Sequence, residues 1–590
     1  MAQSPFRLAL RRFAPHLRGT ARSDLVPDLL AGVAIAALAV PQAVAYALVA
    51  GLPAEMGLAA AGLPALAAAL FGSSRFMVTG PTNPTALLLG VSVVAPALAR
   101  GDDPIAATLA TGLVAGAMLI GLGLLGYGRA SRFLSDSVIC GFNVGVGLLI
   151  ALRYVPMLAG LEPAQHASSP LVPNVWWVVE DAVRAFAAAD PRALVAGIGV
   201  AVLVLAGGRA GARFPAALVA LAIVSAGATL FGWTSGLDPL PRLQAFSLGL
   251  PELHPPGAFD AAQVVPPALA LALLVTVQAL ASARAVESVR GPTLDPDREL
   301  FSQGVANVTA ALVGAQCTSG SLTRSLTARL AGARTRFASV MAGALVALFL
   351  PVLAPGLELV PLAALAGLIV LTGFASISPT QIRRAASTPG DAAVLVVTIA
   401  VTLWLDLVPA VYAGLLLSLA LLVRRAGRLS MVELALGGQR RLREIPIDES
   451  SGTTRAVVLH LEGDLNFAIA PELSDRLQEI CARGPEIVIL RLKRARHLDA
   501  TVLEVLRRLA SELGLRGAEL VLCSLPRPVV ATLARTELGA ALGPERLLSA
   551  GERLHEGVER ALDLARARLR RRPDAEIFRC EPGDDGDYEI

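Results

Sequence analysis

The sequence predicts an all-α polytopic membrane protein that continues into a small cytoplasmic α/β domain. Two observations support the membrane part: 54% of the 590 residues are hydrophobic and only 17% are charged, where soluble domains average about 25%. A third observation marks the second domain, because beyond about Leu429 the long apolar windows give way to strands that alternate with helices. We therefore expect a cytoplasmic N-terminal segment, a membrane domain, an α/β domain and an acidic tail at 1–24, 25–428, 429–572 and 573–590.

Uncharged windows recur through the membrane domain, and each is long enough to cross the hydrocarbon core, which takes about 20 helical residues. They cover 29–54, 76–99, 104–128, 214–237, 337–357 and 359–382. With the shorter apolar stretches they predict fourteen membrane segments, namely 25–50, 54–72, 79–99, 104–127, 133–155, 190–207, 213–232, 262–289, 298–316, 320–333, 336–354, 358–377, 391–406 and 408–425. Residues 175–188 are predicted to be an interfacial helix, because the paired Trp176 and Trp177 suit the headgroup level.

The arginines predict the orientation of these segments. Every connection after an even-numbered segment carries arginine, whereas most odd-numbered connections carry none, as at 51–55 and 405–409. Cytoplasmic loops are enriched in Lys and Arg, so both termini are predicted to be cytoplasmic and the lipid bilayer to be the inner, cytoplasmic membrane. Arginines also precede the first segment without a small-residue cleavage pattern, which argues against a cleavable signal.

Several classes of function find no support in the residues. The net charge is +4 and the basic residues are spread over many loops, so no nucleic-acid site is predicted. The five cysteines lack metal-ligand or disulfide spacing; they are Cys140, Cys317, Cys481, Cys523 and Cys580. The sequence contains no nucleophile–base constellation and no phosphate loop. We therefore expect neither an enzyme nor a bound metal or cofactor.

Short apolar runs and helical spacing predict the α/β domain. Strands are predicted at 457–461, 487–492 and 518–523, and helices at 470–483, 501–513 and near 551–570. Strands that alternate with helices favour a small α/β fold. The acidic stretch 581–590 is expected to be disordered.

Arg324 points to a function. It follows 24 uncharged residues, Leu300 to Thr323, and a guanidinium at membrane depth costs at least about 2.5–3.5 kcal/mol, so it usually faces a cavity or a partner. Gly320, Ser321 and Thr323 are small polar residues at a break between two hydrophobic segments. A broken helix presents the positive end of its dipole to an anion in this way. The stretch therefore predicts an anion-binding site within the membrane.

Six ordered motifs resemble one family of membrane proteins. They are Val40-Pro-Gln-Ala-Val-Ala-Tyr46 with Gly51-Leu-Pro53, Thr79-Gly-Pro-Thr-Asn-Pro84, Gln278-Ala-Leu-Ala-Ser-Ala-Arg284, Asp297-Arg-Glu-Leu-Phe-Ser-Gln-Gly304, Gly320-Ser-Leu-Thr-Arg324 and Ala331-Gly-Ala-Arg-Thr335. In this order they resemble the sulfate permease (SulP) family, whose animal relatives include anion exchangers and prestin. The C-terminal part resembles a STAS domain through Glu462-Gly-Asp-Leu-Asn-Phe467 and Leu498-Asp-Ala-Thr501. The resemblance covers about residues 20–570.

The resemblance implies a uracil-permease-like fold in which the fourteen segments form 7+7 inverted repeats. The third and tenth segments would be half-helices that meet near the midplane. Pro81 and Pro84 suit the first turn of a helix, and Gly320 and Ser321 suit a helix break and an N-cap. Each helix N-terminus offers unpaired N–H groups and about +0.5 charge. The expected partner is a small inorganic anion of oxyanion size, with sulfate favoured because it is common in the family.

Four residues of the first repeat are implied to lie near the anion. Gln42 would point its amide at the anion, or alternatively bond across helices. Tyr46, one turn further on, would form an aromatic wall, or only pack against its neighbours. Thr82 and Asn83 would cap the third segment beside the anion, with capping alone as the alternative.

In the second repeat, Ser321, Leu322 and Thr323 are implied to line the site through backbone and hydroxyl donors. Arg324 would add a full charge and planar donors that suit an oxyanion. The alternatives for Arg324 are snorkelling to the cytoplasmic interface or pairing with an acid such as Glu287.

Gln278 departs from the family pattern, because many bacterial relatives carry a carboxylate there that is suited to carrying a coupled proton. A glutamine cannot titrate, so we expect a uniporter or exchanger without proton coupling at this site residue. The alternative is coupling through another acid, for example Glu287. A sodium-coupled bicarbonate carrier is less favoured, since such members carry an acid in this segment.

The STAS-like part also departs from a known pattern. Ala500 follows Asp499, where anti-sigma-factor antagonists of this fold carry a phosphorylated serine. The domain is therefore expected to support a homodimer and membrane assembly, with a soluble partner as a further option.

Other anions and other classes of protein stay open from the residues. Bicarbonate, chloride or a dicarboxylate would also satisfy the charge argument. An anion channel is an alternative to a carrier. A nucleobase permease is less favoured, because those proteins use acids where this chain has Gln278 and Arg324.

Overall fold

The computed structural model describes most of the chain. The described residues are 22–128, 136–161, 175–209, 211, 214–234, 239–243, 260–287, 294–405, 409, 412–414, 416–417, 419–420, 429–436, 442–446, 454–462, 465–493, 498–550, 556–569 and 578. The chain separates into two compact units, Met1–Leu419 and Ala420–Ile590. Most of the predicted N-terminal segment, of the fourteenth membrane segment and of the acidic tail lies outside the described residues.

The first unit is helical, as predicted. Its first half contains α2 (Arg22–Ala50), α3 (Ala54–Ala61), α4 (Leu63–Phe71), β1 (Val78–Gly80), α5 (Asn83–Leu89), the π-helix η1 (Gly90–Val94), α6 (Ala95–Arg100), α7 (Pro104–Leu124), α8 (Asp136–Arg153), α9 (Val155–Leu158), α10 (Val175–Ala187), α11 (Pro191–Gly208) and α12 (Ala216–Leu230). Its second half contains α13 (Ala261–Val286), α14 (Pro296–Leu312), β2 (Ser319–Ser321), α15 (Leu322–Leu330), α16 (Phe337–Leu357), α17 (Leu362–Ala375), α18 (Pro379–Ala385) and α19 (Pro389–Trp404). Among the described residues, eight helical stretches are long and apolar enough to cross a membrane, and three shorter apolar helices accompany them.

An aspartate is the N-cap residue of four of these helices. The side chains of Asp103, Asp190, Asp260 and Asp295 accept hydrogen bonds from N–H groups in the first turns of α7, α11, α13 and α14. A proline follows three of them at the first helical position, where no N–H donor is needed. The boundaries of these helices are therefore set by local sequence.

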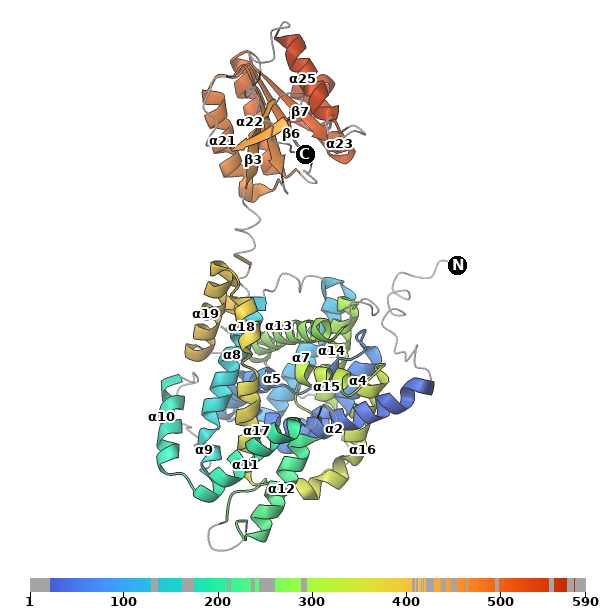
Figure 1. The fold of residues 1–590 in the computed structure, drawn as a ribbon, viewed down its shortest axis with the longest axis vertical. Helices are drawn as coiled ribbons and strands as arrows, with labels where there is room; N and C mark the ends of the chain where they lie inside the picture. The colour runs from blue at the N-terminus through green and yellow to red at the C-terminus, as the bar shows by residue number, and fades with distance from the viewer. Residues whose placement is uncertain are drawn as a thin grey trace. The chain divides into compact units, whose positions relative to one another are not determined.

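The helices of the first unit pack as two bundles (Figure 1). The first bundle consists of α2 to α7 and α13 to α16, and its largest contacts join α14 to α7 and α4, and α16 to α2. The second bundle consists of α8 to α12 and α17 to α19, with α8 against α19 and α11 against α17. The bundles meet where α2 contacts α12 and α17 and where α5 contacts α8.

Close backbone contacts hold each bundle together. A Cβ added to Gly116 of α7 would lie 2.9 Å from the carbonyl oxygen of Gly304 in α14, within the first bundle. A Cβ on Gly367 of α17 would lie 2.1 Å from the carbonyl oxygen of Gly197 in α11, within the second bundle. Only glycine permits helices to approach this closely. Each bundle is therefore packed backbone against backbone.

A pair of short strands crosses the first bundle, and sequence analysis did not predict it. β1 and β2 pair antiparallel in the register Val78↔Ser321, Thr79↔Gly320 and Gly80↔Ser319. The third and tenth segments thus begin as strands, and their helices α5 and α15 start only after them. Extended backbone within a membrane has no water to bind, so its N–H and C=O groups must pair inside the protein. The pairing of β1 with β2 meets this need, and we refer to this strand pair as the crossing.

The second unit is an α/β domain, as predicted. Its sheet has the order β4-β3-β5-β6-β7-β8, in which β5 to β8 are parallel and β3 is antiparallel to both neighbours. The strands are β3 (Ser430–Leu436), β4 (Leu442–Pro446), β5 (Ala456–Glu462), β6 (Ile487–Arg491), β7 (Glu519–Leu525) and β8 (Leu547–Ser549). The helices are η5 (Phe467–Ile469), α21 (Ala470–Ala482), α22 (Ala500–Leu515), α23 (Arg527–Leu533), α24 (Glu537–Leu542), η6 (Pro544–Arg546) and α25 (Glu556–Arg568). The sequence predicted the central β5, β6 and β7 but missed the three outer strands.

The sheet of the second unit carries an apolar core on each face. Leu459, Leu490 and Leu522 point to the side of α21 and α22, whereas Ile489 and Val521 point to the side of α25. The strands β5 to β7 are buried almost throughout, which is why they appear in the sequence as continuous apolar runs.

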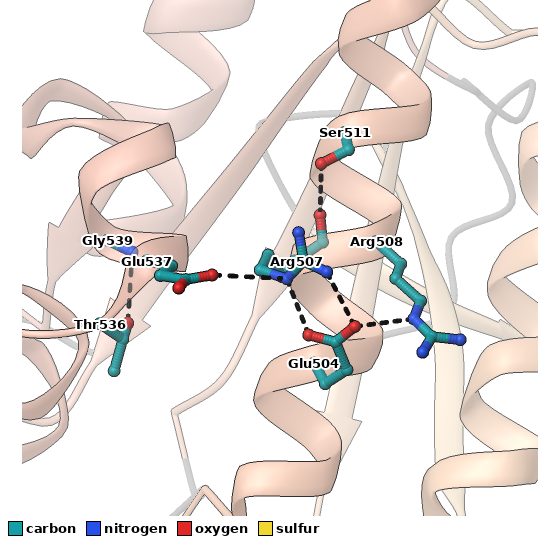
Figure 2. A network of polar contacts seen from close by, with 7 residues as sticks. All are labelled: Glu504, Arg507, Arg508, Ser511, Thr536, Glu537 and Gly539. Atoms are coloured by element: carbon teal, nitrogen blue, oxygen red, sulfur yellow. Dashed lines mark hydrogen bonds and ion pairs between the residues drawn. The ribbon is translucent and has the colours of Figure 1, made fainter.

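An ionic network lies on the surface of α22 (Figure 2). The carboxylate of Glu504 accepts hydrogen bonds from Arg507 Nε at 2.7 Å and Arg508 Nε at 2.8 Å. Arg507 Nε also lies 3.9 Å from an oxygen of Glu537, the first residue of α24. The network joins two helices that cover the same face of the sheet.

Candidate anion-binding site

The helices α5 and α15 begin with hydroxyl-bearing residues at the strand crossing. Thr82 precedes α5, where its N–H donates to Thr85 Oγ1 at 3.2 Å and the two hydroxyl oxygens lie 2.9 Å apart. Ser321 precedes α15, and its hydroxyl accepts from the N–H of Arg324 at 3.4 Å. Thr82 and Ser321 are thus the N-caps, whereas Asn83, which we expected to share the capping, is the first residue of α5.

Arg324 is buried at this crossing, with 1% of its surface exposed. Its Nη2 group donates to the carbonyl oxygen of Pro81 at 2.6 Å. Its Nε and Nη1 groups have no hydrogen-bond partner among the described residues. A cation buried with unsatisfied donors is costly unless a partner compensates its charge. Arg324 therefore brings a full positive charge to this place and has two nitrogen atoms that no described residue binds.

The two alternatives for Arg324 do not fit the structure. A buried side chain does not snorkel to an interface. Glu287 is engaged elsewhere: its Oε1 accepts from Ser74 Oγ at 2.8 Å and from the N–H of Arg75 at 3.0 Å. Across the described ranges, Arg324 forms no ion pair with any acid.

Gly80 makes room for the guanidinium. A Cβ at this position would lie 3.0 Å from both Nη1 and Nη2 of Arg324, and its φ of +157° is one that other residues rarely adopt. The residue before Pro81 must therefore lack a side chain for Arg324 to reach the Pro81 carbonyl. The sequence motif contained Gly80, but nothing in the sequence connected it to Arg324.

Gln278 lies beside the start of α5. Its side chain on α13 is 9% exposed, and its Oε1 accepts from Thr82 Oγ1 at 3.2 Å. No described residue bonds its Nε2 group, which leaves two N–H donors at the same helix end. The structure thus joins Gln278 and Thr82, which lie 196 residues apart in the sequence.

Tyr46 and Gln42 belong to one face of α2, one turn apart. Tyr46 is 8% exposed, lies beside Thr372 of α17, and is close enough to Arg324 to interact with its charge. Gln42 is 5% exposed and makes no hydrogen bond with the described residues. The contact of Tyr46 with Thr372 places a second-bundle residue near the crossing, and no signal in the sequence identified Thr372.

The remaining predicted residues differ in their surroundings. Asn83 is buried, and its Oδ1 has no partner among the described residues. Leu322 is half-buried, and Thr323 is exposed although its neighbour Arg324 is buried. The structure therefore brings Arg324, Tyr46, Thr82 and Gln278 together, whereas the side chain of Thr323 lies outside this cluster.

The chain is similar to known transporters along most of its length. The sulfate permease family matches residues 25–398, and the STAS domain matches residues 446–547. The Arabidopsis thaliana protein named sulfate transporter 4.1, chloroplastic, is 27% identical over 559 residues, which cover 90% of this chain and 79% of that protein.

Two solved structures share the fold. The murine Slc26a9 anion transporter in its inward-facing state has a TM-score of 0.81 at 19% identity, covering 95% of this chain and 96% of that one. The transmembrane domain of the cyanobacterial bicarbonate transporter BicA has a TM-score of 0.58 at 23% identity, covering 68% and 98%. Since the family match spans nearly all of the helical unit, the chain belongs to the sulfate permease family and is a multi-pass anion transporter with a C-terminal STAS domain.

Proposed function

We propose that the protein carries an inorganic oxyanion, with sulfate favoured, across the cytoplasmic membrane, and that the anion binds between the N-termini of α5 and α15 and Arg324. The observation that carries this proposal is the guanidinium of Arg324, which is 1% exposed and has two nitrogen atoms without partners among the described residues. An anion there would accept from the free N–H groups on one edge of the guanidinium and neutralise a buried charge.

The donor geometry favours an oxyanion. A guanidinium edge presents parallel N–H groups that match two oxygens of one anion. Helix N-termini add further N–H donors and about +0.5 charge each. Gln278 and Gln42 would contribute uncharged amide donors. Together, Arg324, the helix N-termini and the two glutamine amides offer several directed donors around one full positive charge. This suits tetrahedral or planar oxygen-bearing anions better than a halide ion.

The relatives support sulfate and leave a second candidate. The Arabidopsis relative is named a sulfate transporter, whereas BicA, 24% identical over 461 residues, is named a bicarbonate transporter. Bicarbonate is also an oxyanion and would use the same donors. Chloride or a dicarboxylate would satisfy the charge alone, and an anion channel would use the same site without alternating exposure.

The same site supports transport without proton coupling at Gln278. Its carboxamide accepts a hydrogen bond from Thr82, and an amide neither gains nor loses a proton in the physiological range. Glu287, the alternative acid, accepts from Ser74 Oγ and from the N–H of Arg75 through Oε1, while its Oε2 has no partner among the described residues. The glutamine at position 278 supports a uniporter or an exchanger, with coupling through Glu287 as the alternative.

Alternating access would arise from movement of the two bundles. Each is tightly packed internally, as at Gly116–Gly304 and Gly197–Gly367, and the bundles meet through fewer elements. The crossing lies in the first bundle, and α8, α12 and α17 of the second bundle face α5 and α2. Sliding of one bundle against the other would expose the site to each side in turn.

We place both termini in the cytoplasm. We assign the STAS domain to the assembly of a homodimer and to the binding of a soluble partner.

The test is uptake of radiolabelled sulfate into liposomes by the wild type, Arg324→Ala and Arg329→Ala. Arg329 is the matched control, since it is an exposed arginine on the same helix. We expect loss of uptake for Arg324→Ala alone, and no dependence on a proton gradient in the wild type. Acceleration by sulfate on the opposite side would identify a carrier rather than a channel. Wild-type uptake of bicarbonate but not sulfate would select the second candidate.

A further inference from the structure

One face of α14 carries three buried polar residues at four-residue spacing. Glu299 is 2% exposed, and Gln303 and Asn307 are fully buried. Residues four apart in a helix lie on the same face. Polar side chains inside a membrane bundle cost free energy unless they form bonds there, so their partners define what this face does.

The first two residues hold the chain that leads into and through β1. The Oε2 atom of Glu299 accepts from the N–H groups of Ser73 at 2.9 Å and Ser74 at 3.1 Å. One turn later, Nε2 of Gln303 donates to Oγ1 of Thr79 in β1 at 2.8 Å. Strand β1 is thereby fixed along the axis of α14.

Asn307 holds the chain that enters β2. Its Oδ1 accepts from the N–H of Thr318 at 2.9 Å, and its Nδ2 donates to the carbonyl of the same residue at 3.0 Å. One amide thus pairs with both backbone groups of Thr318, as a neighbouring strand would. Nδ2 also donates to the carbonyl of Gln303 at 2.9 Å, which fixes the side chain on its own helix.

We propose that Gln303 and Asn307 are positioning residues for the anion site, because together they set where β1 and β2 cross. Each strand has only three residues, and so short a pair holds its register poorly without outside support. Pro81 and the N-cap Thr82 directly follow β1, and the N-cap Ser321 is the last residue of β2, three residues before Arg324. A shift of either strand would misplace those donors. This inference rests on the proposed function, since it assigns the residues to that site.

The test combines transport with a labelling readout that needs no substrate. Cys317 is 2% exposed and precedes Thr318, whereas Cys140 is 7% exposed on α8 of the second bundle. The full-length protein is treated with N-ethylmaleimide, and modification of each cysteine is followed by mass spectrometry. The variants are Asn307→Leu and the milder Gln303→Met. Thr309→Val is the control, because Thr309 lies on the same helix and bonds only the carbonyl of Val305.

We expect Asn307→Leu to raise the labelling rate of Cys317 by at least about tenfold through local opening, with Cys140 unchanged. We expect both variants to raise the KM for sulfate roughly tenfold, because misplaced donors bind the anion poorly, while Vmax per folded protein changes little. Equal acceleration at both cysteines, or a fall in Vmax alone, would mean general loss of stability and would overturn the proposal. Unchanged labelling and KM would overturn it as well.

Asn307→Asp gives a second, pH-dependent test. The ionised carboxylate accepts from the N–H of Thr318 but repels the two carbonyls that Nδ2 normally bonds, whereas the protonated acid can donate to one of them. We expect the variant to recover a low KM at acidic pH, while the wild type and Thr309→Val do not change. A wild type that transports no anion would refute the proposed function, and the Cys317 result would still decide whether Asn307 holds β2.

Discussion

Nη2 of Arg324 lies 2.6 Å from the carbonyl oxygen of Pro81, a residue 243 positions earlier in the chain. The bond links the start of the second half-helix to the start of the first. It also fixes the orientation of the guanidinium, so that Nε and Nη1 stay available. One N–H of Nη2 is thus structural, and we propose that the anion accepts from N–H groups that the described residues leave free.

Because the guanidinium would bind both the Pro81 carbonyl and the anion, we predict that lysine cannot replace Arg324. An ammonium keeps the charge, but it is a point charge and lacks the planar fork needed to hold the Pro81 carbonyl and two anion oxygens at once. We expect Arg324→Lys to lower the ratio of Vmax to KM for sulfate by roughly tenfold or more. Uptake into liposomes measures this, with Arg329→Lys as the control. Wild-type uptake by Arg324→Lys would show that charge alone is sufficient.

Gly80→Ala tests the space for the guanidinium. The added Cβ would lie 3.0 Å from both Nη atoms of Arg324, at a φ of +157°. Because side chain and backbone would both have to shift, we expect anion affinity to fall while the helical content is retained. The stabilisation of the protein by sulfate, measured as a shift in Tm, should disappear. Gly121→Ala, at a glycine of α7 with open space around it, should leave that shift unchanged.

Gln278→Glu should make transport depend on pH. In the buried position beside Thr82, desolvation favours the protonated form of the introduced acid. The protonated form resembles the native amide, whereas the ionised form competes with the anion for the positive site. We therefore expect uptake by the variant to be high at acidic pH and to fall as the pH rises, with a flat wild-type profile. Identical profiles for the two proteins would contradict the assignment of Gln278 to the site.

The ionic network on α22 predicts a contribution to the stability of the STAS domain that is lost in acid. Hydrogen bonds from Arg507 and Arg508 lower the pKa of Glu504 from 4.5 to about 2. Since the pKa is lower in the folded state, the stabilisation is complete above the ordinary pKa and is lost as the pH falls through about 2. A side-chain NMR titration of the second unit, expressed on its own, measures this pKa. In the double variant Arg507→Ala/Arg508→Ala, the pKa of Glu504 should return towards its ordinary value.

Features with a local cause could be predicted from the sequence alone. The apolar windows predicted the helical unit, and the Asp-Pro pairs mark where helices such as α7 and α14 begin. Thr82 and Ser321 have the composition of N-caps and are N-caps in the structure. The buried strands β5, β6 and β7 are apolar throughout and were predicted. The short outer strands were missed, because a three-residue strand such as β8 carries too few residues for a pattern.

The sequence by itself therefore determined the membrane class, the positions of the two helix breaks and a set of candidate residues for an anion site. Only the tertiary structure decided which of them meet. The β1–β2 pair, the Arg324–Pro81 bond, the Gln278–Thr82 bond and the contacts of Asn307 join chain segments through packing. Such contacts depend on where whole helices lie, and the composition of a single segment does not encode this. The candidate site lies where β1 and β2 pair, and each of these two helix breaks alone is only a capped helix end.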